Sequence, residues 1–277
     1  MPTGFSVSPG RGVNLRILGN TVMYNEAHRY LFQCMEWHSG VFDGISAFDD
    51  GSTDDSVAIA ESFGAQVQIR GPLVPSFMDH EGRFRQAAWE WFEESQKPEA
   101  GDWVFAFDAD EFLFGTEDEH SLLMQKCLMA NEEGVGAFNV QVPEVWATLD
   151  GGVDPQIRVD GYWASNTHTR LFKWEPDGKY RDKAMGCGSE PTFVAQAQSE
   201  NLKSMYLLHY GYADPDDRRE KYERYSGHRN HGHNAAHILS IIQSGQLRAW
   251  DGPCTRVERG IPEGRVYQRS SSSEWAY

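Results

Sequence analysis

The chain has 277 residues and a mass of 31.4 kDa, which suits one large α/β domain or one domain with an appendage. With 40% hydrophobic residues, disorder is excluded as a description of the whole chain. The 41 acidic side chains outnumber the 25 basic ones, for a net charge of −16, and such a surface repels a nucleic-acid backbone unless a basic groove or a bound cation reverses the field. No run approaches the roughly 20 apolar residues of a membrane span, and no leader pattern begins the chain, so we expect a soluble, cytoplasmic protein.

The first 71 residues alternate between short apolar runs and helical patterns. An apolar run that reaches Met23 predicts a strand, and the spacing of apolar residues over 26–38 predicts a helix. A second strand is expected at 44–48, followed by a helix that ends at Gly64 and a third strand over 65–71. Strands and helices that alternate through short loops indicate a parallel sheet with right-handed crossovers.

The pattern continues through the middle of the chain. A helix is expected over 81–95, and a nearly continuous apolar run at 102–107 is typical of a strand buried on both faces. A helix near 121–131 and a strand near 136–143 follow. The predicted fold is therefore α/β, with a mostly parallel, Rossmann-like sheet flanked by helices.

Acidic clusters follow two of these strands. Asp49 and Asp50 come directly after the second strand, and Asp108 and Asp110 follow the strand at 102–107. In open α/β sheets, ligands bind beyond the carboxyl ends of the strands. Because Asp108 and Asp110 are two positions apart, they can converge on one Mg²⁺ or Mn²⁺ ion, whose remaining positions diphosphate oxygens and water would fill.

The end of the first strand adds an aromatic residue to this edge. Tyr24 offers a flat surface on which a nucleobase can stack, and an aspartate fixed beside it can accept the imide N–H of uracil or thymine. The three motifs are Tyr-Asn-Glu at 24–26, Phe-Asp-Asp-Gly-Ser-Thr-Asp-Asp at 48–55 and Trp-Val-Phe-Ala-Phe-Asp-Ala-Asp-Glu-Phe-Leu at 103–113. Their order and spacing match one known constellation.

Over roughly residues 15–213, the sequence resembles glycosyltransferase family 2 and its GT-A fold. The resemblance implies a metal-dependent, inverting enzyme of the hexosyltransferase type, which moves a sugar from a nucleotide sugar, in the first place a UDP-sugar, to an acceptor hydroxyl. The residues that it places at the nucleotide are Val22, Tyr24, Asp49, Asp50, Arg83, Arg85 and Asp108. Those that it places at a Mn²⁺ or Mg²⁺ ion are Asp108, Asp110 and His209.

Inversion in one displacement also requires a general base that takes the proton of the acceptor hydroxyl. Family members often carry this group, a His-Glu pair or an Asp, after a strand like Thr-Arg-Leu-Phe-Lys-Trp at 169–174. The corresponding segment here offers Glu190 as the first candidate and Asp182 as the second. The residue directly before Glu190 is a serine and not a histidine, which departs from the family pattern.

The composition changes near residue 214. Residues 214–277 hold 10 basic and 9 acidic side chains, so the excess of acid lies before them. We expect a GT-A domain over 1–213 and a helical extension over 214–277 that closes over the site as a lid. The basic side chains that this extension offers to a diphosphate or an acceptor are Arg218, Arg219, Lys221, Arg224 and Arg229.

Two other functions stay open at this point. A nucleotidyltransferase also combines a doubly wound sheet with Mg²⁺ carboxylates, but the segment at 8–16 matches its glycine-rich phosphate loop poorly. A catalytically inactive nucleotide-sugar-binding module is the other alternative, and the intact Asp108 and Asp110 argue against it. The acceptor, whether a glycan, a protein, a lipid head group or a modified nucleobase, and the oligomeric state do not follow from the sequence.

Overall fold

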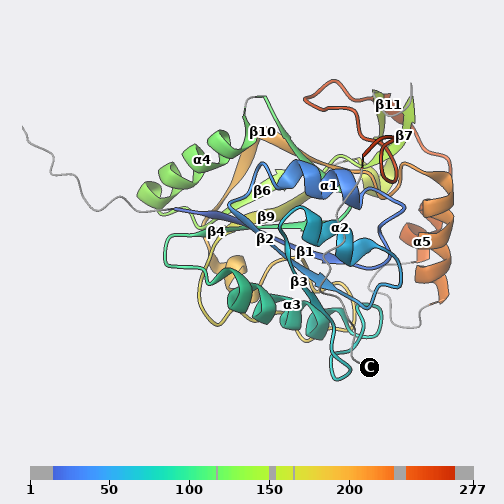
Figure 1. Cartoon of the computed structure of the whole chain (residues 1–277). Coiled ribbons are helices and arrows are strands. Elements are labelled where there is room, and N and C mark those ends of the chain that lie inside the picture. The colour runs from blue at the N-terminus through green and yellow to red at the C-terminus, as the bar shows by residue number, and fades with distance from the viewer. Residues whose placement is uncertain (1–14, 117, 150–153, 165, 228–234, 266–277) are drawn as a thin grey trace, which may run out of the picture.

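The computed structural model describes residues 15–116, 118–149, 154–164, 166–227 and 235–265. Within these residues the chain forms a mixed eight-stranded sheet, a smaller three-stranded sheet and flanking helices (Figure 1). The α/β class predicted from the sequence is confirmed, and the architecture is consistent with a GT-A fold. None of the helices described is long and apolar enough to span a membrane.

The large sheet has the strand order β3-β2-β1-β4-β9-β6-β10-β5. Its strands are β1 (Ile17–Met23), β2 (Gly44–Asp49), β3 (Gln66–Ile69), β4 (Trp103–Asp108), β5 (Glu111–Gly115), β6 (Ala137–Gln141), β9 (Thr167–Lys173) and β10 (Ser199–His209). β3, β2, β1 and β4 pair in parallel, as do β6 and β10, whereas β9 and β5 run against their neighbours. The carboxyl ends of β1, β2 and β4 therefore meet at one edge.

Helices cover both faces of this sheet. They are α1 (Leu31–His38), α2 (Ser56–Ser62), α3 (Glu81–Gln96), α4 (Glu119–Glu133), α5 (Pro215–Gly227) and α6 (Ala235–Ser240), with short 3-10 turns at Gly161–Trp163 and Thr192–Gln196. In Figure 1, α3 lies below the sheet, α1 and α4 lie above it, and α5 stands at the far right.

The helix predicted over 26–38 is shorter than expected, because it begins at Leu31. The N–H groups of Glu26 and Ala27 donate to Ser56 Oγ (2.8 Å) and Asp54 Oδ2 (3.0 Å). These side chains hold the backbone in a turn, and the first helical hydrogen bonds form only after it. The other predicted helices are present, and α4 is extended at its start because Asp118 accepts the N–H of Ser121 (2.7 Å) as an N-cap.

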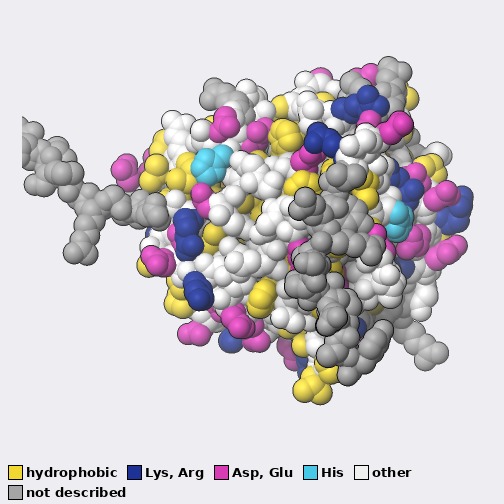
Figure 2. Space-filling view, in the orientation of Figure 1, with side chains coloured by type: hydrophobic (Ala, Val, Ile, Leu, Met, Phe, Trp, Pro, Cys, Tyr) yellow, Lys and Arg dark blue, Asp and Glu magenta, His cyan; other side chains and the backbone are white. Residues whose placement is uncertain are grey.

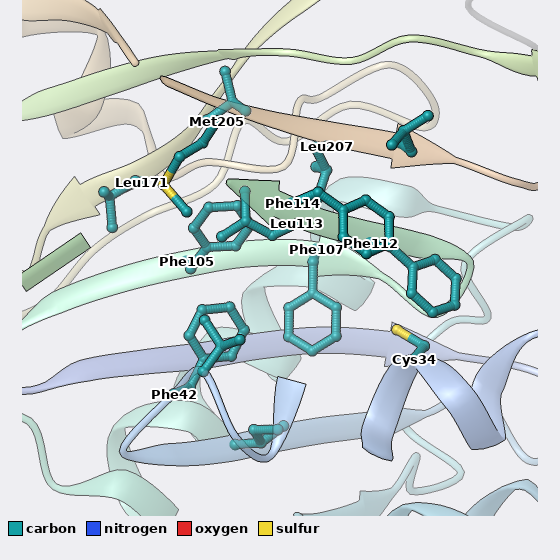
Figure 3. Close-up of a cluster of buried hydrophobic side chains, with 14 of the residues drawn as sticks. Cys34, Phe42, Phe105, Phe107, Phe112, Leu113, Phe114, Leu171, Met205 and Leu207 are labelled. Carbon is teal, nitrogen blue, oxygen red and sulfur yellow. The ribbon is translucent and has the colours of Figure 1, made fainter. Parts of the chain in front are cut away.

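The core is divided by the sheet, because neighbouring residues of a strand point to opposite faces. On β4, Phe105 and Phe107 belong to the large cluster under α1 and α4, while Val104 packs with Trp89 of α3 on the other face. Figure 3 shows the aromatic part of the large cluster, in which Cys34 of α1 lies beside rings from β4 and β5. This double burial explains the nearly continuous apolar run of β4.

The smaller sheet joins the C-terminal part of the chain to the rest. It consists of β7 (Val145–Leu149), β8 (Asp154–Arg158) and β11 (Leu247–Ala249) in the order β11-β8-β7. Beside it, Trp146, Trp163, Tyr212 and Ile241 form a separate cluster on which the tyrosines of α5 pack. The surface over α5 is densely charged with both signs, visible at the right edge of Figure 2. The tyrosines of α5 anchor this helix to the cluster. The domain boundary after residue 213 stays a prediction.

Candidate functional site

A pocket of about 590 Å³ opens at the carboxyl ends of β1, β2 and β4 and is bordered by α5. Six segments line it, namely the β1 end with the following turn, the β2 end, the loop after β3, the first part of α3, the β4 end, and the chain from β10 into α5. The lining residues used below are Val22, Tyr24, Glu26, Arg29, Asp50, Arg70, Phe77, Arg85, Asp108, Asp110, His209, Tyr212, Lys221 and Arg224. Seven of the nine residues predicted to bind the nucleotide or the metal therefore line one pocket. The two others are Asp49 and Arg83.

Two interlocked turns build the first side of the pocket. The N–H of Asn25, at a positive φ of 53°, donates to Ser52 Oγ (2.8 Å), and Asn25 Oδ1 accepts the N–H of Thr53 (2.8 Å). Asp49 is fully buried and accepts from the N–H groups of Gly51 (2.9 Å) and Ser52 (2.8 Å). The carboxylate of Asp49 therefore holds the turn and lies outside the pocket lining.

At this side, which we call the tyrosine end, the pocket residues are Tyr24, Asp50 and Arg70. Tyr24 is 48% exposed, so its ring is available to a ligand. Asp50 lies 2.5 Å from Arg70 Nε and accepts the N–H of Phe77 (2.9 Å). Burial raises the pKa of Asp50, although these two donors oppose the effect. The carboxylate is thus fixed at the pocket wall, and it also ties the loop after β3 to the sheet.

Asp108, at the end of β4, stands on a buried ionic support. Its N–H donates to Glu111 Oε2 (2.9 Å), and Glu111 is paired with Arg170 of β9. Arg170 Nη2 lies 3.7 Å from Asp108 Oδ2, and Nη1 donates to Ser189 Oγ (2.7 Å). The side chain of Asp108 stays 36% exposed, so it faces the pocket while the charged groups behind it are covered.

Asp110, His209 and Lys221 form a second group of pocket residues, which we call the histidine end. His209 Nε2 lies 3.3 Å from Asp110 Oδ1, and Nδ1 lies 2.6 Å from Glu144 Oε2. Burial alone would lower the pKa of His209, but Glu144 and Asp110 raise it well above its ordinary value. Burial likewise works against the charge of Asp110, yet His209 holds its pKa below the usual range.

Gly211 leaves the space in which these groups converge. A Cβ atom at Gly211 would stand 2.3 Å from Asp110 Oδ2, 2.5 Å from His209 Nε2 and 2.7 Å from Lys221 Nζ. Lys221 is 8% exposed, and its ammonium lies over the ring of Tyr212 at 4.2 Å. The histidine end is therefore a packed, charged cradle that a methyl group would fill.

Helix α5 is tied to the first turn of the pocket by Arg29. This buried guanidinium pairs with Glu220 (2.6 Å) and Asp217 (3.4 Å) of α5 and with Glu26 (3.4 Å) of its own turn. These contacts place Lys221 and Arg224, both predicted from the sequence as ligands of a phosphate or an acceptor, in the pocket wall.

Two other basic residues of the predicted extension do not line the pocket, and a third lies outside the described residues. Arg218 donates to the carbonyl of Trp146 (2.7 Å), Arg219 pairs with Asp216 at the surface, and Arg229 lies outside the described residues.

The two arginines of α3 lie in different places. Arg85 is almost buried, pairs with Glu81 (2.8 Å) and lines the pocket. Arg83 is exposed and lies 3.2 Å from Asp182, which also pairs with His80 (3.2 Å). Arg83 and Asp182 thus form a surface ion pair outside the pocket lining.

Glu190 lines neither the large pocket nor the narrow cavity next to it. It is partly buried, and burial raises its pKa, while Arg181, Arg170 and Arg85 oppose this effect. Its neighbour Ser189 lines the narrow cavity together with Arg85, Arg170 and Asp108. Asp108 and Arg85 line both this cavity and the large pocket, so Ser189, the residue next to Glu190, lies close to residues of the pocket wall.

The histidine end fits a divalent cation. Among the residues that the structure describes, no group of three or more His, Cys, Asp or Glu side chains is arranged to hold a metal ion. Asp110 and His209 nevertheless present an oxygen and a nitrogen side by side, Asp108 lines the same wall, and Gly211 leaves the cradle open. Carboxylate oxygens are the ligands that Mg²⁺ and Mn²⁺ prefer, and imidazole is a common further ligand.

Sequence reasoning missed three residues of this site. Glu144 lies 65 positions before the histidine that it contacts, and it stands in no motif. Arg29 follows the Tyr-Asn-Glu motif, and Arg70 follows β3. Their position next to a motif or a strand end was the only signal in the sequence, and it is weak, because most arginines are exposed and a sequence does not show which ones are buried.

Comparisons with known proteins give remote structural similarity only. No family model and no curated protein matches the chain. A structure of S. aureus TarS is 13% identical with a TM-score of 0.41, covering 82% of this chain and 42% of TarS. TarS 1-349 in complex with UDP is 14% identical, with a TM-score of 0.42 and coverage of 82% and 69%.

A structure of M. tuberculosis glucosyl-3-phosphoglycerate synthase with Mn²⁺, UDP-glucose and phosphoglyceric acid is also similar to part of the chain. It is 20% identical, with a TM-score of 0.30, and the match covers 47% of this chain and 43% of the synthase. The chain thus spans less than half the length of full-length TarS and of the synthase. A function for this chain has to come from the geometry of its own pocket.

Proposed function

We propose that the chain transfers a sugar from a UDP-sugar to an acceptor hydroxyl, with inversion at the anomeric carbon and with the help of Mn²⁺ or Mg²⁺. The observation that carries the proposal is the pairing of unlike ends in one pocket. The tyrosine end offers an exposed ring and a fixed carboxylate, and the histidine end offers cation ligands next to Lys221 and Arg224. A nucleoside diphosphate has the same polarity, with a flat base at one end and a doubly charged group at the other.

The tyrosine end suits a uracil base. Tyr24 stacks on the ring, and Asp50 accepts the imide N–H with a lone pair that Arg70 and Phe77 leave available, since each carboxylate oxygen can accept two hydrogen bonds. Arg70 beside it is placed to donate to a base carbonyl. Cytosine carries an acceptor where uracil carries its N–H, so the carboxylate of Asp50 disfavours it.

The histidine end suits the diphosphate. Asp108, Asp110 and His209 would hold the divalent cation, which when bound supplies positive charge to the leaving diphosphate. Lys221 and Arg224 donate to the phosphate oxygens from α5, and Arg85 donates from the opposite wall. Because these donors come from packed elements, they need little reorganisation as negative charge develops on the leaving group.

Glu190 is our candidate for the general base, with Asp182 as the second candidate. The raised pKa of Glu190 brings its basicity closer to that useful for accepting a proton near neutral pH. Asp182 is exposed and already paired with Arg83 and His80, which makes it the weaker choice. Glu190→Gln is expected to lower kcat roughly 10²-fold with unchanged affinity for UDP.

Calorimetry of UDP binding tests the proposal. In the presence of Mn²⁺ we expect at least about tenfold tighter binding than in EDTA, equivalent to about 1.4 kcal/mol. The parent should prefer UDP to CDP, and this preference should disappear in Asp50→Ala. Equal affinity for UDP with Mn²⁺ and with EDTA would contradict the metal assignment, and retained base preference in Asp50→Ala would contradict the base assignment. Mass spectrometry after incubation with a panel of nucleotide sugars and candidate acceptors then identifies the transferred sugar.

A further inference from the structure

The two ring nitrogens of His209 have different partners. Nε2 faces the pocket beside Asp110 (3.3 Å), and Nδ1 faces away from it toward Glu144 (2.6 Å). Glu144 does not line the pocket and has no role in the function proposed above. A carboxylate behind a pocket histidine therefore needs its own explanation.

Glu144 is held firmly in this position. Its Oε1 accepts from Asn166 Nδ2 (2.9 Å), and the residue is 5% exposed. Its backbone forms a parallel bridge with His209, the His209 N–H donates to Pro143 O (3.1 Å), and the Arg158 N–H donates to Glu144 O (3.0 Å). Main chain and side chain thus keep the carboxylate against Nδ1.

This arrangement fixes what the imidazole can present to the pocket. When a cation displaces the proton from Nε2, the carboxylate at Nδ1 retains the other proton on that nitrogen, so that the Nε2 lone pair is the one that binds the cation. The negative charge of Glu144 also raises the basicity of the ring and makes Nε2 a better ligand. Without Glu144, the ring could rotate or adopt the other tautomer.

We propose that Glu144 is a positioning residue that orients His209 as a ligand of the divalent cation. The inference rests on the proposed function, because it takes His209 as a metal ligand. A purely structural role for Glu144, which would only join the segment before β7 to β10, is the competing explanation. The two explanations differ in what a substitution of Glu144 would change. If Glu144 positions His209, its loss lowers the affinity for the metal; if its role is purely structural, its loss lowers only the melting temperature.

The experiment measures Mn²⁺ affinity at saturating UDP, by electron paramagnetic resonance of free Mn²⁺, for the parent, Glu144→Gln and Glu144→Ala. We expect a loss of about 10- to 100-fold in Glu144→Ala and a smaller loss in Glu144→Gln, whose side-chain oxygen still accepts from Nδ1–H. The affinity for UDP in EDTA should change less than about twofold. Nitrogen-15 NMR of the His209 ring, measured without metal, should show loss of the single Nδ1–H tautomer in the apo variants at a pH where the ring is neutral.

Glu93→Gln is the matched control, because Glu93 also accepts from a ring N–H, that of Trp174 (3.3 Å), but on α3 outside the pocket lining. Its Mn²⁺ affinity should equal that of the parent. Folded Glu144→Gln and Glu144→Ala variants with parental Mn²⁺ affinity would overturn the proposal for Glu144 alone. If His209→Ala also keeps parental Mn²⁺ affinity, the metal role of His209 fails, and the role of Glu144 fails with it. Should Glu144→Ala not fold, the isosteric Glu144→Gln decides by the same criterion.

Discussion

The two ends of the pocket are built in different ways. The tyrosine end takes its residues from positions 24 to 70, within the first two strand-helix units and the end of β3. The histidine end gathers Asp110 from the turn after β4, His209 from β10 and Lys221 from α5, segments more than 90 residues apart at the extremes. The first depends on local turn chemistry, and the second depends on the completed sheet.

The ends also differ in how much space surrounds them. Tyr24 is about half exposed, whereas Lys221 is almost completely buried and converges with Asp110 at Gly211. A change at the open end removes one contact and leaves its neighbours in place. A change at the packed end disturbs several charged groups at once, because each serves as a partner of the next. We therefore expect larger effects at the histidine end.

His209→Ala is expected to produce the largest effect. It removes the proposed cation ligand and leaves Glu144 buried without its ionic partner, so kcat for donor hydrolysis or sugar transfer should fall about 10²- to 10³-fold. Steady-state release of UDP from a UDP-sugar, with Mn²⁺ in excess, measures this. A kcat within about tenfold of the parent value would contradict the expectation that substitutions at the histidine end have the larger effects.

Gly211→Ala tests the packing at the histidine end without removing a functional group. The new methyl group would overlap with Asp110, His209 and Lys221, and overpacking of this kind costs about 1–3 kcal/mol. UDP affinity in Mn²⁺ should fall about tenfold. Gly71→Ala, in the loop next to the tyrosine end, is the control, because a Cβ there meets nothing within 4 Å. A loss in both variants, or in neither, would contradict the prediction.

Tyr24→Ala should have the smallest effect. The ring is exposed, and the turns that position it are held by Asn25 and Ser52, so the change removes a stacking surface worth about 1 kcal/mol at such a site. Calorimetry should show UDP binding about fivefold weaker, with the ratio of affinities in Mn²⁺ and EDTA unchanged. A change in that ratio would mean that the two ends are energetically coupled.

Much of the fold and the tyrosine end could be predicted from the sequence, because both depend on short-range patterns. Strand and helix periodicity gave the order of the elements, and motifs at strand ends gave Tyr24, Asp50, Asp108 and Asp110, which the pocket brings together. The predicted start of α1 was wrong, because the N–H groups of Glu26 and Ala27 donate to the side chains of Ser56 and Asp54 and the helix begins only after them.

Glu144 escaped prediction for a different reason. It contacts His209 only because two segments far apart in sequence are bridged beside β10, and no periodicity reports such a contact. The ion pair between Asp182 and Arg83 is also a contact between distant segments that no periodicity reports. Asp182 was predicted from the sequence as a candidate general base. Its role as a base stays a prediction.

The position of α5 also bears on when the protein becomes competent during its synthesis. The strands β1, β2 and β4 can pair before α5 is made, since all three lie within the first 108 residues of the chain. Arg29 finds Asp217 and Glu220 only when α5 has emerged from the ribosome and docked. Until then a nascent chain contains the tyrosine end but lacks Lys221 and Arg224, the basic pocket residues of α5. UDP binding by ribosome-bound chains of increasing length should therefore appear abruptly, late in translation, rather than grow with each added strand.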